Sequence, residues 1–282
     1  SRDKPNRMTI GDRTRDMTDV IVDTYHRHHL DALVCLGGAG TQKNALLLKQ
    51  AGLNVVTLPK TIDNDISYVQ TTFGFETAVS EAKKATCAAN AEASGARNGI
   101  GLVKLMGRDS GFIAAFSVLV DNEVNFCLIP EVPFTLDGFL SALKQRLEYQ
   151  GHAVIVVAEG AGQELFEATG ERDASGNIKY GDIGILLCDR IKEHFKKTGM
   201  EIGLKYIDPS YMIRSQQANP HDSAFCLLLG HNAVHAGMAG RTGMIVGCYL
   251  VQRGMQGKEA LDRVRILHFG ARQKLPGCAF EK

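Results

Sequence analysis

The chain alternates short apolar runs with longer segments of helical periodicity. Continuous apolar runs rich in β-branched residues predict strands that are buried on both faces of a parallel sheet. These runs lie at 32–36, 53–58, 100–106, 125–129, 152–158, 204–207 and 244–251. Segments with an apolar stripe at every third or fourth position predict helices. These segments lie at 12–29, 42–51, 76–93, 112–120, 135–149, 183–197 and 219–237. The alternation predicts an α/β protein with mainly parallel sheets. Beyond Gly254 the pattern weakens into a basic helix and a tail with Gly and Pro.

Polar residues gather where four of the predicted strands end. They follow the strands in the segments 59–65 (PKTIDND), 107–111 (GRDSG), 130–131 (PE) and 159–160 (EG). Open α/β sheets bind their ligands outside the carboxyl ends of the strands. These four segments therefore predict an active site at that edge of the sheet.

The first of these segments carries two carboxylates, Asp63 and Asp65, two positions apart. In an extended segment both would project to one side, where they repel unless a cation or a proton lies between them. Phosphoryl transfer can use both, one to accept the proton of an attacking hydroxyl and one to hold a metal. The alternative is an Asx-rich turn that caps the next helix. The pair alone does not choose between the two.

A glycine loop, GGAGT at 37–41, joins the strand 32–36 to the helix that follows. Free backbone N–H groups and the positive end of a helix can bind a phosphate in such a loop. The loop matches neither GxxxxGK[ST] nor GxGxxG, so a tight strand-to-helix turn is the alternative.

Composition narrows the class of protein. The 282 residues are 44% apolar and 22% charged, which is typical of a soluble globular protein. A net charge of +1 gives no reason to expect a nucleic acid or a membrane surface as partner. Seven cysteines without a CxxC pair predict a reducing, cytoplasmic setting. The sequence shows no signal peptide and no spanning segment.

Six motifs stand in a fixed order along residues 1–247. They are GGAGTQKNA (37–45), PKTIDNDI (59–66), TTFGFETAV (71–79), KLMGRDSGFIAA (104–115), VVAEGAGQ (156–163) and KYIDPSYMIRS (205–215). Together they resemble the phosphofructokinase family, and most closely its ATP-dependent branch of trypanosomatids, plants and some bacteria. That family opens with a strand and a glycine-rich loop, and the resemblance begins downstream of both.

The resemblance implies two Rossmann-like lobes with mainly parallel sheets and an active-site cleft between them. Residues 1–75 and 214–250 would form the nucleotide-side lobe, and residues 76–213 the sugar-phosphate lobe. Residues 251–282 do not resemble the family and form a divergent tail. A homo-oligomer, either a dimer or a tetramer, is also implied.

The resemblance assigns catalytic roles to four residues. Asp63 matches the base that takes the proton from the 1-hydroxyl of fructose 6-phosphate. Asp65 matches the second carboxylate, and Thr61 a group that contacts the transferred phosphoryl group. Arg108 would stabilise charge on that group.

Binding roles are assigned in the same way. The residues that match the sugar-phosphate site are Thr61, Asp63, Asp65, Met106, Gly107, Arg108, Glu159, Lys205, Tyr211 and Arg214. The residues that match the nucleotide site are Gly37, Gly38, Gly40, Thr41, Lys60 and Arg2. Lys205 falls where shorter bacterial enzymes use an Arg that reaches in from a neighbouring subunit.

Two residues of the glycine loop decide the expected cofactors. Where the family has an Asp that binds Mg²⁺, this chain has Ala39, which leaves Asp65 as the candidate metal ligand. Pyrophosphate users carry Asp at the position of Gly40, and Gly leaves room for a nucleotide. Lys60 is typical of pyrophosphate users but also occurs in the long ATP-using branch. The expectation is thus a glycolytic ATP-dependent 6-phosphofructokinase that uses ATP and Mg²⁺.

Two alternatives stand beside this expectation. One is a pyrophosphate-dependent phosphotransferase, and the other is a catalytically silent subunit that still binds sugar phosphate. Ala39 favours the silent subunit, whereas the intact TIDND and MGR motifs favour chemistry. A purely structural α/β domain would leave the polar strand ends unexplained.

Overall fold

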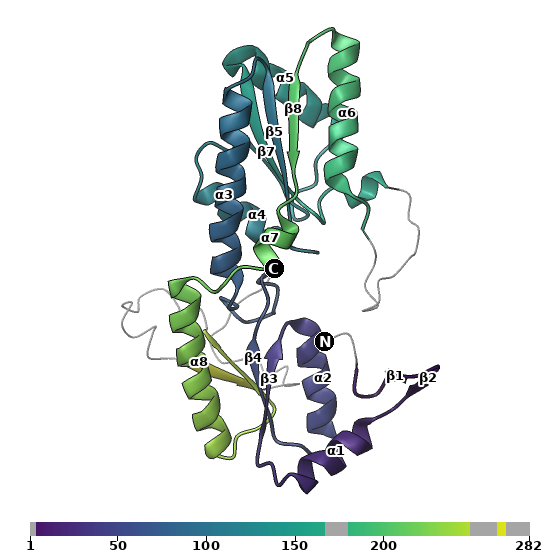
Figure 1. The fold of residues 1–282 in the computed structure, drawn as a ribbon, viewed down its shortest axis with the longest axis vertical. Helices are drawn as coiled ribbons and strands as arrows, with labels where there is room; N and C mark the ends of the chain where they lie inside the picture. Colours follow the sequence, from purple (N-terminus) through teal and green to yellow (C-terminus); the bar gives the residue numbers. More distant parts are fainter. Residues whose placement is uncertain (1–3, 167–179, 249–263, 269–282) are drawn as a thin grey trace, which may run out of the picture. The chain divides into compact units, whose positions relative to one another are not determined.

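The computed structural model describes residues 4–166, 180–248 and 264–268, and these fold into two compact units (Figure 1). Unit 1 takes in the described residues of Ser1–Lys60, Tyr68–Gln70 and Leu227–Lys282. Unit 2 takes in those of Thr61–Ser67 and Thr71–Cys226. Each unit is an α/β structure with parallel strands, as the alternation of apolar runs and helical segments predicts.

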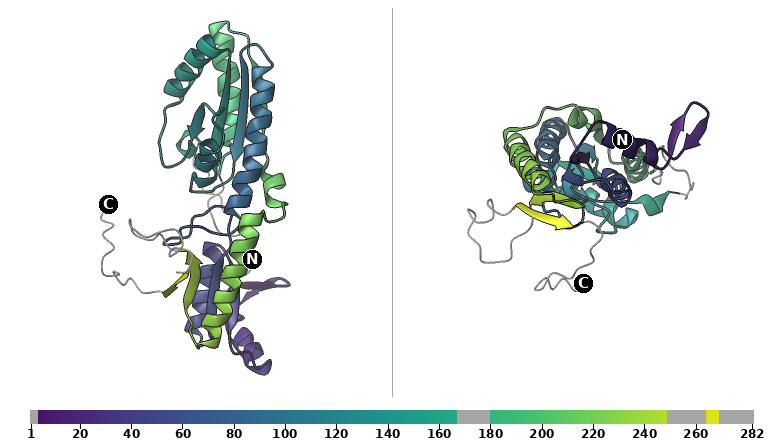
Figure 2. Two further views of the ribbon diagram at one scale, coloured as in Figure 1. Left: turned by 90° about the vertical axis from the view of Figure 1, so that its left-hand side faces the viewer. Right: turned by 90° about the horizontal axis from the view of Figure 1, so that it is seen from below.

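Unit 2 is built on a four-stranded parallel sheet in the order β6-β7-β5-β8. Its strands are β5 (Gly99–Leu105), β6 (Phe126–Leu128), β7 (His152–Ala158) and β8 (Gly203–Ile207). The sheet is flanked by α3 (Phe75–Ser94), α4 (Phe112–Leu119), α5 (Leu136–Gln150) and α6 (Ile183–Thr198). Figure 2 shows that α3 and α5 lie on opposite sides of the sheet. The unit is therefore a three-layer structure with helices on both faces.

The period-2 alternation of β5 assigns its side chains to two separate cores. Val103 and Leu105 pack in the core with α3 and α4, whereas Ile100 and Leu102 pack in the core with α5 and α6. Lys104 has the same parity as Ile100 and Leu102, so it lies on the face that α6 covers. On that face Lys104 forms ion pairs with Asp182 and Asp208.

Unit 1 contains a four-stranded sheet in the order β10-β9-β4-β3. Its strands are β3 (Leu33–Gly37), β4 (Val55–Pro59), β9 (Met244–Cys248) and β10 (Val264–His268). The first three run parallel, and β10 runs antiparallel to β9. The helices of this unit are α1 (Thr18–Arg27), α2 (Ala39–Gln50) and most of α8 (Pro220–Met238). Every residue of β4 is buried, as its continuous apolar run predicts.

The structure corrects the predicted elements in three places. Residues 12–29 do not form one helix, because β1 (Met8–Ile10) and β2 (Arg13–Arg15) pair antiparallel before α1 begins at Thr18. Beyond Gly254, where a basic helix was expected, the described segment is the strand β10. A short helix, α7 (Ser210–Arg214), was not predicted.

Two expectations fall wholly or mostly outside the described residues. The tail 251–282 is described only at residues 264–268, and Arg2 lies in the undescribed first three residues. Within the described ranges, no helix has the length and apolar character that crossing a membrane requires.

Candidate functional site

The segment that follows β4 is an irregular loop rather than an extended strand. Asn64 has a φ of 54°, which is the left-handed region, so the condition under which Asp63 and Asp65 would share one side does not hold. Asn64 Oδ1 accepts hydrogen bonds from Thr72 N at 2.8 Å and from Thr72 Oγ1 at 3.2 Å. The loop thereby folds back on itself ahead of α3. Gly74 is the N-cap of α3 and no side chain caps it, so the Asx-cap alternative is wrong for both aspartates.

Asp63 is half-buried in this loop and held at both its backbone and its side chain. Its carboxylate accepts from Thr61 Oγ1 at 3.3 Å, its N–H donates to the same oxygen at 3.2 Å, and its carbonyl accepts from Ser110 Oγ at 3.2 Å. Burial raises the pKa of Asp63, and the nearby charges of Asp65 and Glu159 raise it further. Arg214 and the Thr61 hydroxyl act in the opposite direction. The structure thus brings three carboxylates and one guanidinium into electrostatic range of one another.

Arg108 and Glu159 follow two neighbouring strands, β5 and β7, whose last residues Leu105 and Ala158 lie opposite each other. Glu159 Oε1 accepts from Arg108 N at 2.8 Å, and Glu159 N donates to Leu105 O at 2.8 Å. Parallel strands in register therefore bring the predicted sugar-binding carboxylate to the predicted charge-stabilising residue. This proximity was expected from the strand ends alone.

The turn after β5 has an unusual backbone. Gly107 has a φ of 144°, and a Cβ there would collide with the carbonyl oxygen of Ser110. Arg108 has a φ of 50°, which L-residues other than Asn and Asp rarely adopt. The result is a turn that leaves the Arg108 side chain exposed. Met106 is only 2% exposed and packs in the core, so its backbone alone could face a ligand.

One of the four polar strand ends has a structural role. Gly111 N donates to Glu131 at 2.8 and 3.1 Å to the two carboxylate oxygens. Gly111 is the N-cap of α4, so the Glu131 carboxylate binds the positive end of that helix. This interaction accounts for the polar residue after β6 without a ligand.

The remaining sugar-phosphate candidates are on β8 and α7. Tyr211 and Arg214 are exposed residues of α7, and Arg214 lies close enough to Asp63 to lower its pKa. Lys205 is different, because it lies opposite Gly101 in the sheet, four positions before the strand end at Leu105. It forms an ion pair at 3.9 Å with Glu92, and both side chains are 62% exposed. The structure therefore does not bring Lys205 to the other candidates within one chain.

The nucleotide candidates form the corresponding edge of the sheet in unit 1. Gly37 ends β3, Gly38 is the N-cap of α2, and Thr41 lies in the first turn of that helix. A Cβ at Gly37 would collide with the Thr41 side chain, so the glycine allows a close approach. Lys60 is exposed and its N–H donates to Gly37 O at 3.1 Å, which brings the end of β4 beside the loop. Arg2 lies outside the described residues.

The first turn of α2 has features that suit an anion. No side chain caps the helix, and its first turn carries no acidic residue. Ala39 and Gly40 are both exposed, and a Cβ at Gly40 would meet no atom within 4 Å. The backbone N–H groups and the helix dipole at this end can bind a phosphate.

The residues present fit a shared metal rather than an all-protein metal centre. In the described part of the chain, no group of three or more His, Cys, Asp or Glu could hold an ion. Asp65 is exposed and interacts electrostatically with Asp63, so these two carboxylates are the protein ligands that the loop could offer to a metal ion. Mg²⁺ is commonly held by one or two carboxylates together with substrate phosphates and waters. Asp65 remains a predicted ligand on this basis.

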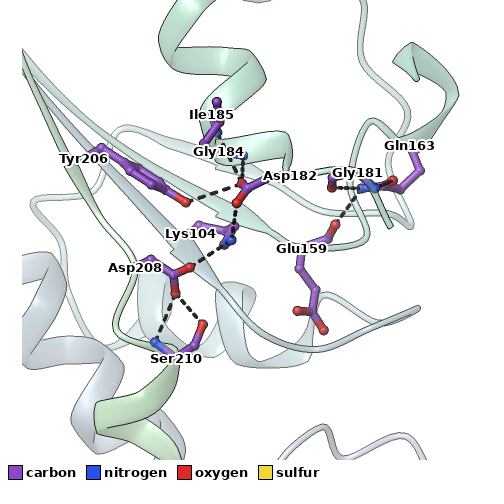
Figure 3. A network of polar contacts seen from close by, with 10 residues as sticks. All are labelled: Lys104, Glu159, Gln163, Gly181, Asp182, Gly184, Ile185, Tyr206, Asp208 and Ser210. Atoms are coloured by element: carbon purple, nitrogen blue, oxygen red, sulfur yellow. Dashed lines mark hydrogen bonds and ion pairs between the residues drawn. The ribbon is translucent and has the colours of Figure 1, made fainter. Parts of the chain in front are cut away.

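A polar network around Lys104, near the end of β5, was not predicted from the sequence (Figure 3). Lys104 Nζ lies 2.8 Å from Asp208 Oδ2 and 3.0 Å from Asp182 Oδ2. Asp182 is the N-cap of α6, and Asp208 lies just before α7. A lysine within the apolar run 100–106 is a signal that could have identified it, because a charge in a buried strand requires partners.

The network gives a pH dependence of stability that can be measured. Burial raises the pKa of Asp208, but hydrogen bonds from Lys104 and Ser210 outweigh it, so the folded-state pKa lies below the ordinary value of 3.8. Its contribution to the free energy of unfolding is therefore complete above pH 3.8 and is lost as pH falls through the lower folded-state pKa. We expect urea unfolding between about pH 5 and about pH 2 to show a shallower loss of stability for Asp208→Asn than for the natural protein. Parallel curves would contradict this, and Asp189→Asn on the exposed side of α6 is the control.

Two α/β units with polar groups at the ends of parallel strands place the protein in the class of open α/β proteins that bind ligands there. Solved structures with this fold are phosphofructokinases. One from Nitrosospira multiformis, described as pyrophosphate-dependent, has a TM-score of 0.69 at 19% identity and covers 93% of this chain and 65% of its own. The phosphofructokinase from Saccharomyces cerevisiae has a TM-score of 0.68 at 21% identity, with coverages of 90% and 36%. At these identities the similarity shows the fold alone.

The chain belongs to the phosphofructokinase family, whose model, described as Phosphofructokinase, matches residues 2–237. The ATP-dependent 6-phosphofructokinase of Borreliella burgdorferi is 50% identical over 245 residues, which are 81% of this chain and 55% of that protein. ATP-dependent 6-phosphofructokinase 5, chloroplastic, of Arabidopsis thaliana is 48% identical, over 80% of this chain and 44% of that protein. The Trypanosoma brucei brucei enzyme of the same name is 45% identical, over 80% and 48%. The predicted family and branch are confirmed. The chain spans about half the length of the curated relatives it matches.

Proposed function

We propose that the protein is an ATP-dependent 6-phosphofructokinase of glycolysis. It would transfer the γ-phosphoryl group of ATP to O1 of fructose 6-phosphate and form fructose 1,6-bisphosphate. The observation that carries this proposal is the half-buried Asp63 with Glu159 and Arg214 in electrostatic range, at the carboxyl ends of the unit 2 strands. The names of relatives at 45–50% identity support it.

Asp63 is the proposed base. It accepts the proton of the sugar 1-hydroxyl while O1 forms its bond to the γ-phosphorus and the bond from that phosphorus to the leaving ADP oxygen breaks. Thr61, hydrogen-bonded to Asp63, would contact the transferred phosphoryl group, and Arg108 would stabilise its charge. Fixed positions matter here because an oriented reaction loses little entropy at the transition state.

Unit 2 would bind the sugar phosphate. Glu159 would accept hydrogen bonds from sugar hydroxyls, while Tyr211 and Arg214 on α7 would bind the 6-phosphate. Met106 and Gly107 would contribute backbone groups at the end of β5. The exposed guanidinium of Arg214 suits this role because it can form two parallel hydrogen bonds to a phosphate.

Unit 1 would bind the nucleotide. Gly37, Gly38, Gly40 and Thr41 form the candidate phosphate loop, with Lys60 beside it and Arg2 as a further predicted contact. Mg²⁺, held by Asp65 and nucleotide phosphate oxygens, would supply charge neutralisation on the transferred group. Gly40 favours ATP over pyrophosphate, because it lacks the carboxylate that pyrophosphate users carry at this position and a Cβ there would meet no atom within 4 Å.

The alternatives keep one supporting observation each. Lys60, which is typical of pyrophosphate users, supports the first alternative. A silent subunit is favoured only by Ala39, which removes a carboxylate from the loop. Relatives named for ATP are far more similar in sequence, so ATP use is the better supported proposal.

A coupled assay tests the proposal. The protein is given fructose 6-phosphate and Mg²⁺ with either ATP or pyrophosphate, and fructose 1,6-bisphosphate formation is followed. Product formed with ATP and not with pyrophosphate supports the proposal. Product formed only with pyrophosphate would support the first alternative. Sugar-phosphate binding without turnover from either donor would support the silent subunit.

Replacing Arg214 by Ala should weaken fructose 6-phosphate binding. A hydrogen bond to a charged group is worth about 1.5–3 kcal/mol, so KM should rise roughly tenfold to a hundredfold while kcat changes little. Initial-rate kinetics at varied fructose 6-phosphate measure both constants. Arg190→Ala, which removes an exposed arginine of α6 that pairs with Glu193, is the control. An unchanged KM in Arg214→Ala would remove Arg214 from the binding site.

We further expect a cytoplasmic homo-oligomer, either a dimer or a tetramer. Within one chain Lys205 lies apart from the other candidate residues, so it would reach a sugar-phosphate site only in a neighbouring subunit of an oligomer. Sedimentation of the protein at several concentrations tests the expectation of an oligomer.

A further inference from the structure

Lys104 is a half-buried cation on the sheet of unit 2. Its side chain is 14% exposed, and its ammonium group binds Asp208 at 2.8 Å and Asp182 at 3.0 Å. Burial lowers the pKa of Lys104, but the hydrogen bonds to the two carboxylates outweigh it and raise the pKa above its ordinary value. Lys104 is therefore a charged group with two fixed partners.

Both carboxylates use their second oxygen to hold the start of a helix. Asp182 Oδ1 accepts from Gly184 N at 3.1 Å and Ile185 N at 3.2 Å, which caps α6. Asp208 Oδ1 accepts from Ser210 N at 3.1 Å and from the Ser210 hydroxyl, which fixes the first residue of α7. Lys104 thus connects one strand to two helix N-termini.

The network continues toward Glu159 (Figure 3). Gln163 Nε2 donates to Glu159 O at 2.8 Å, and Gln163 Oε1 accepts from Gly181 N at 3.0 Å. Gly181 directly precedes Asp182. Tyr206 adds a hydroxyl that donates to Asp182 Oδ1 at 3.4 Å. A continuous series of polar contacts therefore joins the Glu159 backbone to the helix that carries Arg214.

Helix α7 depends on outside contacts for its orientation. It has five residues, far below the length at which a helix is stable alone. Tyr211 and Met212 are 89% and 62% exposed, and Ile213 is its single buried residue. Ile213, which packs in the core with α3, and the Asp208–Lys104 contact therefore hold its two ends.

We propose that Lys104 is a positioning residue, which holds α7 through Asp208 so that Arg214 keeps its place beside Asp63. The inference rests on the proposed function, because it assigns Arg214 to the sugar phosphate. Lys104 itself touches neither substrate nor the reacting atoms. Its effect is on the geometry of binding rather than on the chemical step.

The test compares Lys104→Met with Lys104→Arg in the natural protein. For Lys104→Met we expect KM for fructose 6-phosphate to rise about tenfold, the lower end of what the loss of one hydrogen bond to a charged group costs, with kcat within about twofold. Lys104→Arg should stay near the natural KM, because a guanidinium can donate to both carboxylates. Lys197→Met removes an exposed lysine that pairs with Glu193 on α6 and should change neither constant. An unchanged KM in Lys104→Met, or a fall in kcat alone, would overturn the proposal.

The variant Asp208→Asn covers the case in which Lys104→Met folds poorly, and a double variant tests whether the two residues act through one contact. Asp208→Asn keeps an oxygen for Ser210 but loses its charge contact with Lys104, so it should raise KM in the same direction while the fold is kept. The double variant Lys104→Met/Asp208→Asn should raise KM no more than Lys104→Met alone, because both remove one contact. Fully additive effects would mean that the two residues act separately and would overturn the proposal.

A readout without substrate separates this inference from the proposed function. Trypsin cleaves backbone that unfolds locally, so a less firmly held α7 should make cleavage after Arg214 roughly tenfold faster in Lys104→Met than in the natural protein. Mass spectrometry measures this rate against cleavage after Arg190. Faster cleavage in a protein that does not bind fructose 6-phosphate would support the proposal that Lys104 holds α7 and would contradict the proposed function. Unchanged cleavage would reject the holding role even in an active enzyme.

Discussion

Replacing Asp63 by Asn should lower kcat for phosphoryl transfer to fructose 6-phosphate by about 10²–10⁴-fold, the range that loss of a general base causes. Asparagine has the size of aspartate and can still accept from the Thr61 hydroxyl, so the loop should keep its structure. It cannot accept the sugar proton. The fall could be larger, because the same charge would also organise the phosphoryl group and its metal.

The KM of this variant distinguishes chemistry from binding. Arg108, Glu159 and Arg214 remain, so KM for fructose 6-phosphate should change little. Asp189→Asn on α6 is the matched control and should leave both constants unchanged. Initial rates at varied sugar phosphate and saturating ATP provide the measurement. Full turnover in Asp63→Asn would show that the loop is a structural turn.

Replacing Gly40 by Asp should abolish the use of ATP, with a loss in kcat/KM of more than about a hundredfold. A carboxylate placed among phosphates repels them, and such like-charge contacts cost several kcal/mol. The variant should fold normally, because a Cβ at Gly40 meets no atom within 4 Å and Gly40 is not among the glycines with positive φ. An acidic residue in the first turn of α2 should even stabilise the helix slightly.

This combination makes Gly40→Asp informative, since activity and stability should change in opposite directions. Thermal unfolding and equilibrium ATP binding are measured beside the coupled assay. Gly230→Asp, on α8 and also without neighbours within 4 Å, is the control for adding a charge to a helix of unit 1. Comparable ATP turnover in Gly40→Asp would mean that nucleotide phosphates do not approach this loop.

The sequence predicts the parallel strands of this protein well because they are continuous apolar runs. The runs at 100–106 and 152–158 appear as β5 and β7 within one residue at each end, since strands buried on both faces contain few polar positions. The glycines and charged residues that follow these two strands, at 107–111 and 159–160, mark the strand ends in the sequence. For the same reason, the meeting of Arg108 with Glu159 could be expected before the structure was known.

Contacts between distant segments could not be predicted in this way. Lys104 meets Asp182 and Asp208 across 78 and 104 positions, and no local pattern specifies either partner. The strand β10 was missed because its pairing with β9, rather than its own polarity, decides its structure. The pair of aspartates left an extended segment and an Asx-rich turn both open, because the bond from Asn64 to Thr72, eight positions later, that bends the loop is not visible in a local pattern.

Because Arg108 has a left-handed backbone, replacing it by glycine should raise thermal stability and lower activity. An L-residue in that region costs about 1–2 kcal/mol relative to glycine, so Arg108→Gly relieves strain at the position where the proposed mechanism needs a guanidinium. A laboratory selection for thermal endurance alone would therefore favour loss of this arginine. A selection that scores sugar phosphorylation in parallel would retain it and find its stabilising substitutions elsewhere. We therefore expect variants selected for heat resistance alone to carry glycine at position 108, and variants selected for activity as well to keep Arg108.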